Sequence, residues 1–195
     1  MRENKAFVFL YPIPQIIDWE IENNKNSFGN NEKTFGKVYE RTINQCIDLR
    51  YRKRGFNINY AIFDDCIVSD IININLNDRI IKVGLNFDMH TSKKEYPDQD
   101  FILNQLGDID TLRVAGFHMW DCVEKLAKRA HERKLNTLID EDLTEFFPSR
   151  INDESFRVEI YPTFNPYTTK TLDREWFVKA FLEARKGKQW LWQNY

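Results

Sequence analysis

The sequence has little of what marks several large classes of protein. Its three cysteines, Cys46, Cys66 and Cys122, are an odd number at wide spacing, with no Cys-x-x-Cys pair and no histidine-paired zinc pattern. This argues against a disulfide scaffold and a structural zinc site. No apolar run approaches the roughly 18 residues of a membrane span, and no small-residue cleavage site follows the first apolar run. We therefore expect a protein of the reducing cytoplasm without a signal peptide or membrane span.

A strong net charge is also missing. The chain has 28 basic and 30 acidic residues, a formal net charge of -2, so there is no global attraction to nucleic acid or anionic membrane. Internal repeats and low-complexity segments are absent. With 195 residues, 42% hydrophobic and 30% charged, the composition is ordinary for one globular domain with a sizeable core. We expect residues 1–195 to form a single domain.

What the chain does contain is a series of apolar runs of strand length. They lie at 6–10, 58–63 and 80–85 and again from Leu112 to Gly116, and such runs are typical of strands buried on both faces of a parallel sheet. Helical patterns separate them, the strongest from Phe35 to Ile47, where Cys46 falls on the buried stripe. The pattern predicts an α/β fold: three layers, with a mostly parallel five- or six-stranded sheet and helices on both faces.

Basic residues close the helix predicted from Phe35. Arg50, Arg52, Lys53 and Arg54 precede Gly55. Cations in the last turn and a glycine just after it are a helix C-terminal signature, because they complement the dipole and allow a left-handed cap. A phosphate-binding patch is the alternative interpretation.

Aromatic residues reach 14% and gather toward the C-terminus. After a break at Pro148 we expect a last strand at 158–161 and an amphipathic helix at 172–185. The ending carries Trp190, Trp192 and Tyr195. Because exposed clusters of aromatic side chains invite association, we expect segment 161–195 to dock on its own domain or on the partner in a homodimer.

Polar side chains accompany two of the predicted strands. Asp64 and Asp65 end the strand at 58–63, where α/β sheets hold their sites, although a helix cap or a solvated turn would also explain them. Lys82 lies inside the predicted strand at 80–85, where a buried amine needs a partner or water. It is therefore either functional or directed outward. His90 follows in a polar loop, where we expect it to be exposed.

The stretch from Leu112 to Phe147 predicts a βαβ unit: a buried strand, a glycine turn, a helix and a second strand that ends in acids. Asp121 can cap a helix from Cys122 to Arg133. Cys122 would then lie in the first turn, where free backbone N–H groups and the positive end of the dipole stabilise a thiolate. Cys122 is therefore the candidate nucleophile.

The segment Gly116-Phe-His-Met-Trp-Asp-Cys122-Val123 resembles the G-x-x-x-x-x-C-V turn of the isochorismatase-like cysteine hydrolases, which include nicotinamidases, carbamoylases and other amidases. The resemblance is clear from about 80 to 147. It implies a Rossmann-like fold and an Asp–Lys–Cys triad. Cys122 matches the nucleophile, and Lys82 lies at about the separation of the family's lysine. The family's aspartate belongs at the end of the first strand, where this chain reads Phe9-Leu10-Tyr11-Pro12.

Without that aspartate the acid and base roles stay open. An amidase needs a base for the thiol and an acid for the leaving amine, and the candidates are Asp64, Asp65 and His118. The family's Asp and His metal motif is not evident, so we expect no metal and no cofactor. Two functions follow: a thiol hydrolase that acts on a small amide through Cys122, or a catalytically silent relative that binds a small ligand or a protein. Nucleic-acid binding through Arg50–Arg54 is a third.

Overall fold

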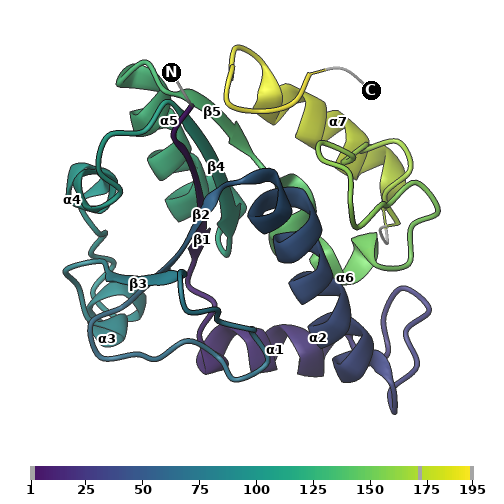
Figure 1. Cartoon of the computed structure of the whole chain (residues 1–195). Helices are drawn as coiled ribbons and strands as arrows, with labels where there is room; N and C mark the ends of the chain where they lie inside the picture. Colours follow the sequence, from purple (N-terminus) through teal and green to yellow (C-terminus); the bar gives the residue numbers. More distant parts are fainter. Residues whose placement is uncertain (1–2, 171–172, 194–195) are drawn as a thin grey trace.

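The computed structural model describes residues 3–170 and 173–193. One sheet of five parallel strands runs through its centre in the order β3-β2-β1-β4-β5 (Figure 1). The strands are β1 (Lys5–Leu10), β2 (Asn57–Ile62), β3 (Arg79–Lys82), β4 (Thr111–Gly116) and β5 (Asn136–Ile139). The chain starts in the middle, builds toward β3 and then returns past β1 to build toward β5, which is the doubly wound arrangement. The predicted α/β fold with a parallel sheet is confirmed.

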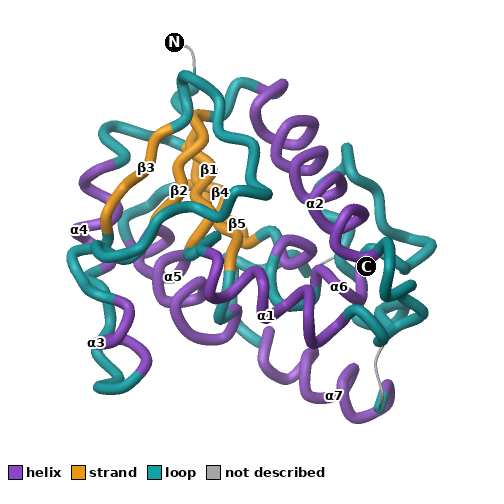
Figure 2. Tube along the Cα trace, turned by 90° about the horizontal axis from the view of Figure 1, so that it is seen from below, coloured by secondary structure: helices purple, strands orange, loops and turns teal. Residues whose placement is uncertain are grey.

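Helices cover both faces of the sheet, as Figures 1 and 2 show together. On one side α4 (Gln99–Gln105) and α5 (Glu124–Glu132) pack against each other, and on the other lie α1 (Pro14–Asn24), α2 (Phe35–Cys46) and α6 (Phe147–Arg150). The remaining α-helices are α3 (Phe87–Thr91) and α7 (Arg174–Arg185), π-helical turns cover Ile47–Tyr51 and Met119–Val123, and 3-10 turns cover Arg52–Arg54 and Glu141–Leu143. Because all five strands are parallel, their carboxyl ends lie at the same edge of the sheet.

Strand β1 is the centre of the core because it pairs with β2 on one side and with β4 on the other. Every residue from Ala6 to Leu10 is at most 1% exposed, which explains why this segment is a continuous apolar run and not an alternating one. On one face of the sheet Phe7 stacks on Tyr51 with 4.0 Å between ring centroids. The helical stripe that includes Cys46 is buried as predicted.

Two segments differ from the sequence prediction. Residues 158–161 form no strand, because arginine side chains occupy their backbone carbonyls: Arg50 donates to Val158 at 3.0 Å and Arg54 donates to Glu159 at 2.7 Å. Pro14 begins α1, a helix that was not predicted because two prolines precede or begin it. Proline is tolerated at the first helical position because its missing N–H would have no partner there.

The basic residues before Gly55 form a helix ending, and Gly55 adopts the left-handed conformation with φ 78°. Arg50 is not on the surface, since it is only 2% exposed and its guanidinium binds Asp140 and Asp142. Arg52 pairs with Asp78 at 2.6 Å and Lys53 with Asp48 at 3.4 Å. The C-terminal signature is confirmed, and these contacts leave no cluster of unpaired cations in the segment.

The described part of the C-terminal segment lies against β5 and its neighbours. Ile139 N–H donates to the Trp190 carbonyl at 2.9 Å, and Arg185 forms a buried ion pair with Glu141. Phe181 is 3% exposed among other aromatic rings. Residues 171–172 and 194–195, which include Tyr195, lie outside the described residues, and association with a second copy stays a prediction.

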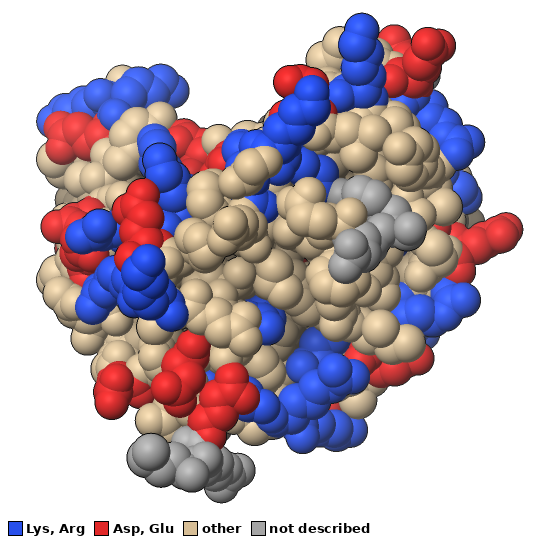
Figure 3. All heavy atoms as spheres, turned by 90° about the horizontal axis from the view of Figure 1, so that it is seen from above, with Lys and Arg blue, Asp and Glu red and all other residues tan. Residues whose placement is uncertain are grey.

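The surface carries both signs of charge. On the face in Figure 3, Lys and Arg side chains alternate with Asp and Glu around a centre of uncharged residues, in keeping with the formal net charge of -2. Among the helices of residues 3–170 and 173–193, none is both long enough and apolar enough to cross a bilayer.

Gly116 is the position where the turn after β4 tolerates no side chain. Its φ is +120°, and a Cβ there would lie 2.2 Å from the Leu10 carbonyl oxygen and 2.6 Å from the Leu10 nitrogen. We expect Gly116→Ala to lower the free energy of unfolding by about 2–3 kcal/mol, because strain and a backbone clash add. Urea denaturation measures this. Gly107→Ala is the control, since it has φ +78° with nothing within 4 Å; an equal loss in both variants would exclude the clash.

Candidate active site

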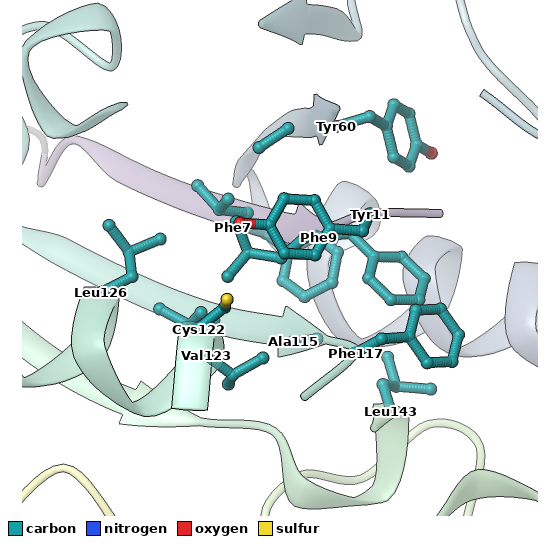
Figure 4. Packing of buried hydrophobic residues seen from close by; sticks show 14 of the residues in the cluster. Phe7, Phe9, Tyr11, Tyr60, Ala115, Phe117, Cys122, Val123, Leu126 and Leu143 are labelled. Carbon is teal, nitrogen blue, oxygen red and sulfur yellow. The ribbon is translucent and has the colours of Figure 1, made fainter. Parts of the chain in front are cut away.

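Cys122 lies at the carboxyl ends of β1 and β4, in a helix that begins earlier than predicted. His118 takes a left-handed conformation, with φ 66° and ψ 62°, and the π-helical turn Met119–Val123 runs directly into α5. Asp121 is therefore inside the helix and is not its N-cap. Its carboxylate pairs with Lys125 at 2.5 Å. Cys122 is only 3% exposed, with its sulfur directed toward the end of β1 (Figure 4).

The imidazole of His90 is the base nearest to this thiol. Cys122 Sγ lies 3.7 Å from His90 Nε2, and His90 Nδ1 lies 2.8 Å from the Glu95 carbonyl oxygen. A carbonyl oxygen can only accept, so Nδ1 carries the proton and Nε2 is left as the acceptor that faces the thiol. A nucleophile beside a base that a third group orients is the arrangement of covalent catalysis.

His90 was expected in a polar loop, and that prediction is wrong. It lies in α3 and is 8% exposed, with its ring against those of Phe63 at 5.2 Å and Tyr96 at 5.3 Å between centroids. The available signal in the sequence was the spacing of Phe87 and His90, about one helical turn apart.

Tyr11 occupies the end of β1, where the resemblance places an aspartate. Its ring stacks on Phe63 with 4.4 Å between centroids, and its hydroxyl lowers the pKa of the Cys122 thiol. Figure 4 shows this hydroxyl on the side of the ring that faces the sulfur. Burial raises the pKa of Tyr11 far above its usual value. The position therefore supplies a neutral hydrogen-bonding group and no negative charge.

Burial also raises the pKa of the Cys122 thiol, to about 11. The Tyr11 hydroxyl and the Lys125 charge oppose this rise, while the charges of Asp121 and Glu145 add to it. At neutral pH the sulfur therefore holds its proton, and a nucleophile can arise only when a base removes that proton during attack. His90 is placed to do so.

We expect Cys122 in the resting protein to react slowly with iodoacetamide at neutral pH, with a half-maximal rate near pH 11 where an unperturbed thiol shows one near ~8.5. The measurement is alkylation against pH, with each modified cysteine identified by mass spectrometry. Cys46, which is 0% exposed, provides the unreactive internal reference. A midpoint below pH 8 would show a preformed thiolate and contradict burial as the dominant cause.

The structure gives three of the predicted site residues contacts with loop backbone. Lys82 Nζ donates to the carbonyls of Cys66 at 2.7 Å and Phe63 at 3.3 Å. The Asp64 carboxylate accepts from Gly84 N–H, and the Asp65 carboxylate accepts from Phe87 N–H, both at 2.9 Å. These bonds join the loops after β2 and β3. The bond from Phe87 N–H to Asp65 also fixes the start of α3. The three residues thus support the segment that carries His90, and none of these hydrogen bonds reaches the thiol.

His118 lies beside His90, with 5.9 Å between ring centroids, and the residue is partly open to solvent. Partial burial and the nearby His90 lower the pKa of His118. Both rings line a cavity of about 220 Å³ together with Thr91, Lys94, Tyr96 and Asp121. This cavity opens the site to solvent on the His90 side. Among residues 3–170 and 173–193, no three His, Cys, Asp or Glu side chains are grouped as metal ligands.

No protein-family model matches the chain, and no curated protein matches it. Solved structures do. An isochorismatase family protein shows a TM-score of 0.48 and 15% identity, with 98% of each chain covered. N-carbamoylsarcosine amidase from Thermoplasma acidophilum shows a TM-score of 0.47 and 17% identity, over 72% of this chain and 83% of that one.

A proposed MAR1 ribonuclease from Leishmania major shows a TM-score of 0.47 and 12% identity over 73% of this chain. The chain spans 65% of the length of that protein. Because these TM-scores lie below 0.5, we infer the function below from the residues of this chain alone. The chain is similar in fold, at low sequence identity, to solved isochorismatase-like hydrolases.

Proposed function

We propose that this protein is a thiol hydrolase that cleaves a small amide through Cys122, with His90 as its general base and acid. The observation that carries the proposal is the line from Glu95 carbonyl through His90 to the Cys122 sulfur, with distances of 2.8 Å and 3.7 Å. Such contacts in a resting site tighten when substrate binds. The 220 Å³ cavity beside His90 suits a small acyl or carbamoyl group.

In the proposed reaction the Cys122 proton moves to His90 Nε2 as the sulfur attacks the amide carbon. The C–S bond forms while the carbonyl π electrons move to oxygen. The imidazolium then returns the proton to the leaving amine as the C–N bond breaks, which leaves a thioester on Cys122. Water, deprotonated by His90, attacks the thioester and releases the acid and the thiol. One imidazole serves both as base and as acid, so no first-strand aspartate is required.

Tyr11 acts as a positioning residue in this scheme. Its hydroxyl lowers the pKa of Cys122 against the effect of burial. It therefore favours the charged sulfur that forms during attack.

The second candidate is a catalytically silent binding protein. The exposed fraction of 3% and the thiol pKa near 11 favour it, because a buried protonated thiol is a poor nucleophile unless the base acts. Ligand binding without turnover would then be the function of the cavity.

The test is release of ammonia or amine from a panel of small primary amides and N-carbamoyl amines. We expect turnover by the natural chain, its loss in Cys122→Ala and a fall of about 10²–10⁴-fold in kcat in His90→Gln. Cys66→Ser is the matched control, because Cys66 is a buried cysteine whose sulfur contacts Asp65 and not His90. Turnover that survives in Cys122→Ala would refute the hydrolase, and binding without turnover would establish the silent protein.

A further inference from the structure

A second and larger cavity adjoins the Cys122 site. Its volume is about 540 Å³, within the usual range for small-molecule sites. It shares Thr91 and His118 with the cavity beside His90, so the two meet at these residues. Helix α1, helix α3, the turn after β4 and Glu145 form its wall. Neither His90 nor Cys122 lines the larger cavity, so the way from it to His90 passes Thr91 and His118.

The walls of the larger cavity are mainly apolar and aromatic. Trp19, Phe87 and Phe117 contribute rings, and Ile16 adds aliphatic surface. Trp19 is 60% exposed, so part of its ring is open to a molecule in the cavity. Aromatic faces of this kind attract both apolar groups and organic cations.

Two carboxylates lie in the same wall. Glu20 is 5% exposed and receives one hydrogen bond, at 3.2 Å, from the Asn24 amide. Glu145 accepts the Met119 N–H with both oxygens, at 2.8 and 3.0 Å. Among residues 3–170 and 173–193, no Lys, Arg or His forms an ion pair with either group. Buried charged groups normally have a partner of opposite charge. These two carboxyl groups therefore differ from the usual case, because no described cation pairs with them.

Glu145 has a structural task, since it holds the turn that begins the Cys122 helix. Glu20 has no such task, because its one hydrogen bond joins it to a residue of its own helix. Burial, and after it the charge of Glu145, raises the pKa of Glu20 to about 8. The buried Tyr39 hydroxyl, which feels the Glu20 charge, has no hydrogen-bond partner within the described part of the chain. A cation bound in the cavity would therefore stabilise the ionised form of Glu20, which has no other partner of positive charge among the described residues.

We infer that this cavity binds a small organic ammonium group, held by Glu20 and by the rings of Trp19, Phe87 and Phe117. An ammonium group fits better than a metal ion, because aromatic rings and Ile16 dominate the wall. In addition, both oxygens of Glu145 already accept from the Met119 N–H. The binding of an ammonium group does not depend on the proposed hydrolase function. The substrate assignment does rest on it: the substrate is then an amide that carries an amine, with its amine in this cavity and its carbonyl at Cys122.

Titration calorimetry at pH 7 tests the site without any chemistry. The probes are phenethylammonium and 2-phenylethanol, which differ chiefly in charge. We expect the ammonium to bind at least ten times more tightly than the alcohol to the natural protein. Glu20→Gln should remove that preference, whereas Glu22→Gln, an exposed glutamate on the same helix that pairs with Lys25, should retain it.

Repeating the titration in buffers of different ionisation enthalpy should show release of a proton on ammonium binding, because Glu20 must ionise. Equal affinity for the two probes, or a preference that survives in Glu20→Gln, would overturn the inference. Tight binding of Ca²⁺ or Zn²⁺ that depends on Glu20, without a preference for the ammonium, would overturn it in favour of a metal site.

Turnover is tested separately with ω-aminoalkanamides and the matching unsubstituted alkanamides. A higher kcat/KM for the amino compounds, reduced in Glu20→Gln, is expected if both proposals hold. Ammonium binding without hydrolysis of either series would refute the hydrolase and keep the cavity. Hydrolysis of both series at equal kcat/KM would refute the cavity's role and keep the hydrolase.

Discussion

Replacing Asp140 by alanine is expected to lower the free energy of unfolding by about 3–5 kcal/mol, as removal of one partner from a buried ion pair does. Asp140 is 0% exposed and accepts from Arg50 Nη1 at 2.9 and 3.0 Å and from the Tyr51 hydroxyl. Without it Arg50 keeps Asp142, which it shares with Arg150. The buried guanidinium is then short of negative charge, so the folded state loses stability. Thermal and urea unfolding measure the loss.

Asp48→Ala is the matched control, because its carboxylate also pairs with arginine but is 37% exposed. Exposed pairs contribute about 0–1 kcal/mol. The double variant Arg50→Met with Asp140→Ala should lose less than the sum of the single losses, since the unpaired cation is then absent. A loss below about 1 kcal/mol in Asp140→Ala would show that water or a neighbouring carboxylate replaces it.

Replacing Glu20 by glutamine is expected to stabilise the protein, by about 3 kcal/mol at pH 7 and about 5 kcal/mol at pH 9. Burial and the Glu145 charge raise the pKa of Glu20 from 4.5 to about 8. Between these values the folded chain holds a proton that the unfolded chain has released, so the natural protein loses stability as pH rises toward 8. Glutamine has no proton to lose. The gain should therefore fall below about 1 kcal/mol at pH 5.

Urea denaturation of both proteins from pH 5 to pH 9 measures this difference. Glu22→Gln should change the free energy of unfolding by no more than about 0.5 kcal/mol at any pH, as exposed substitutions do. A Glu20→Gln gain that does not vary with pH would disprove the titration of Glu20 as its cause. A destabilised variant would show that the carboxylate has a partner that glutamine cannot replace.

Taken together, the two effects of Glu20→Gln separate stability from binding. A buried carboxylate that costs stability at neutral pH is retained where function needs it. If the glutamine variant is more stable and also loses its preference for the ammonium probe, then the Glu20 carboxylate both destabilises the folded protein and binds the ammonium group.

The sequence located the nucleophile candidate but not its partner. The turn from Gly116 to Cys122 is local, so its glycine, cysteine and following helix are visible in the order of residues. The base is not local: His90 belongs to α3, which follows β3, and it reaches the thiol only because β3 and β4 lie in one sheet with their carboxyl ends together. Lys82, predicted at a suitable separation along the chain, instead bonds to the loop after β2.

By itself the sequence determined the elements whose signals are short in range. Continuous apolar runs gave β1 and β2, which are buried on both faces, and a 3.6-residue stripe gave α2 with Cys46 inside it. The run at 80–85 differs: β3 covers only Arg79–Lys82 at the edge of the sheet, where Ile80 is 48% exposed. Only the tertiary structure decided which polar groups meet. It placed Arg50 in the core between two aspartates ninety residues away or more and set Tyr11 and His90 beside Cys122. It also left Glu20 with no ion-pair partner among the residues that the structure describes. Charges and hydrogen bonds act across space, and their partners come from strands and helices that the sequence alone does not bring together.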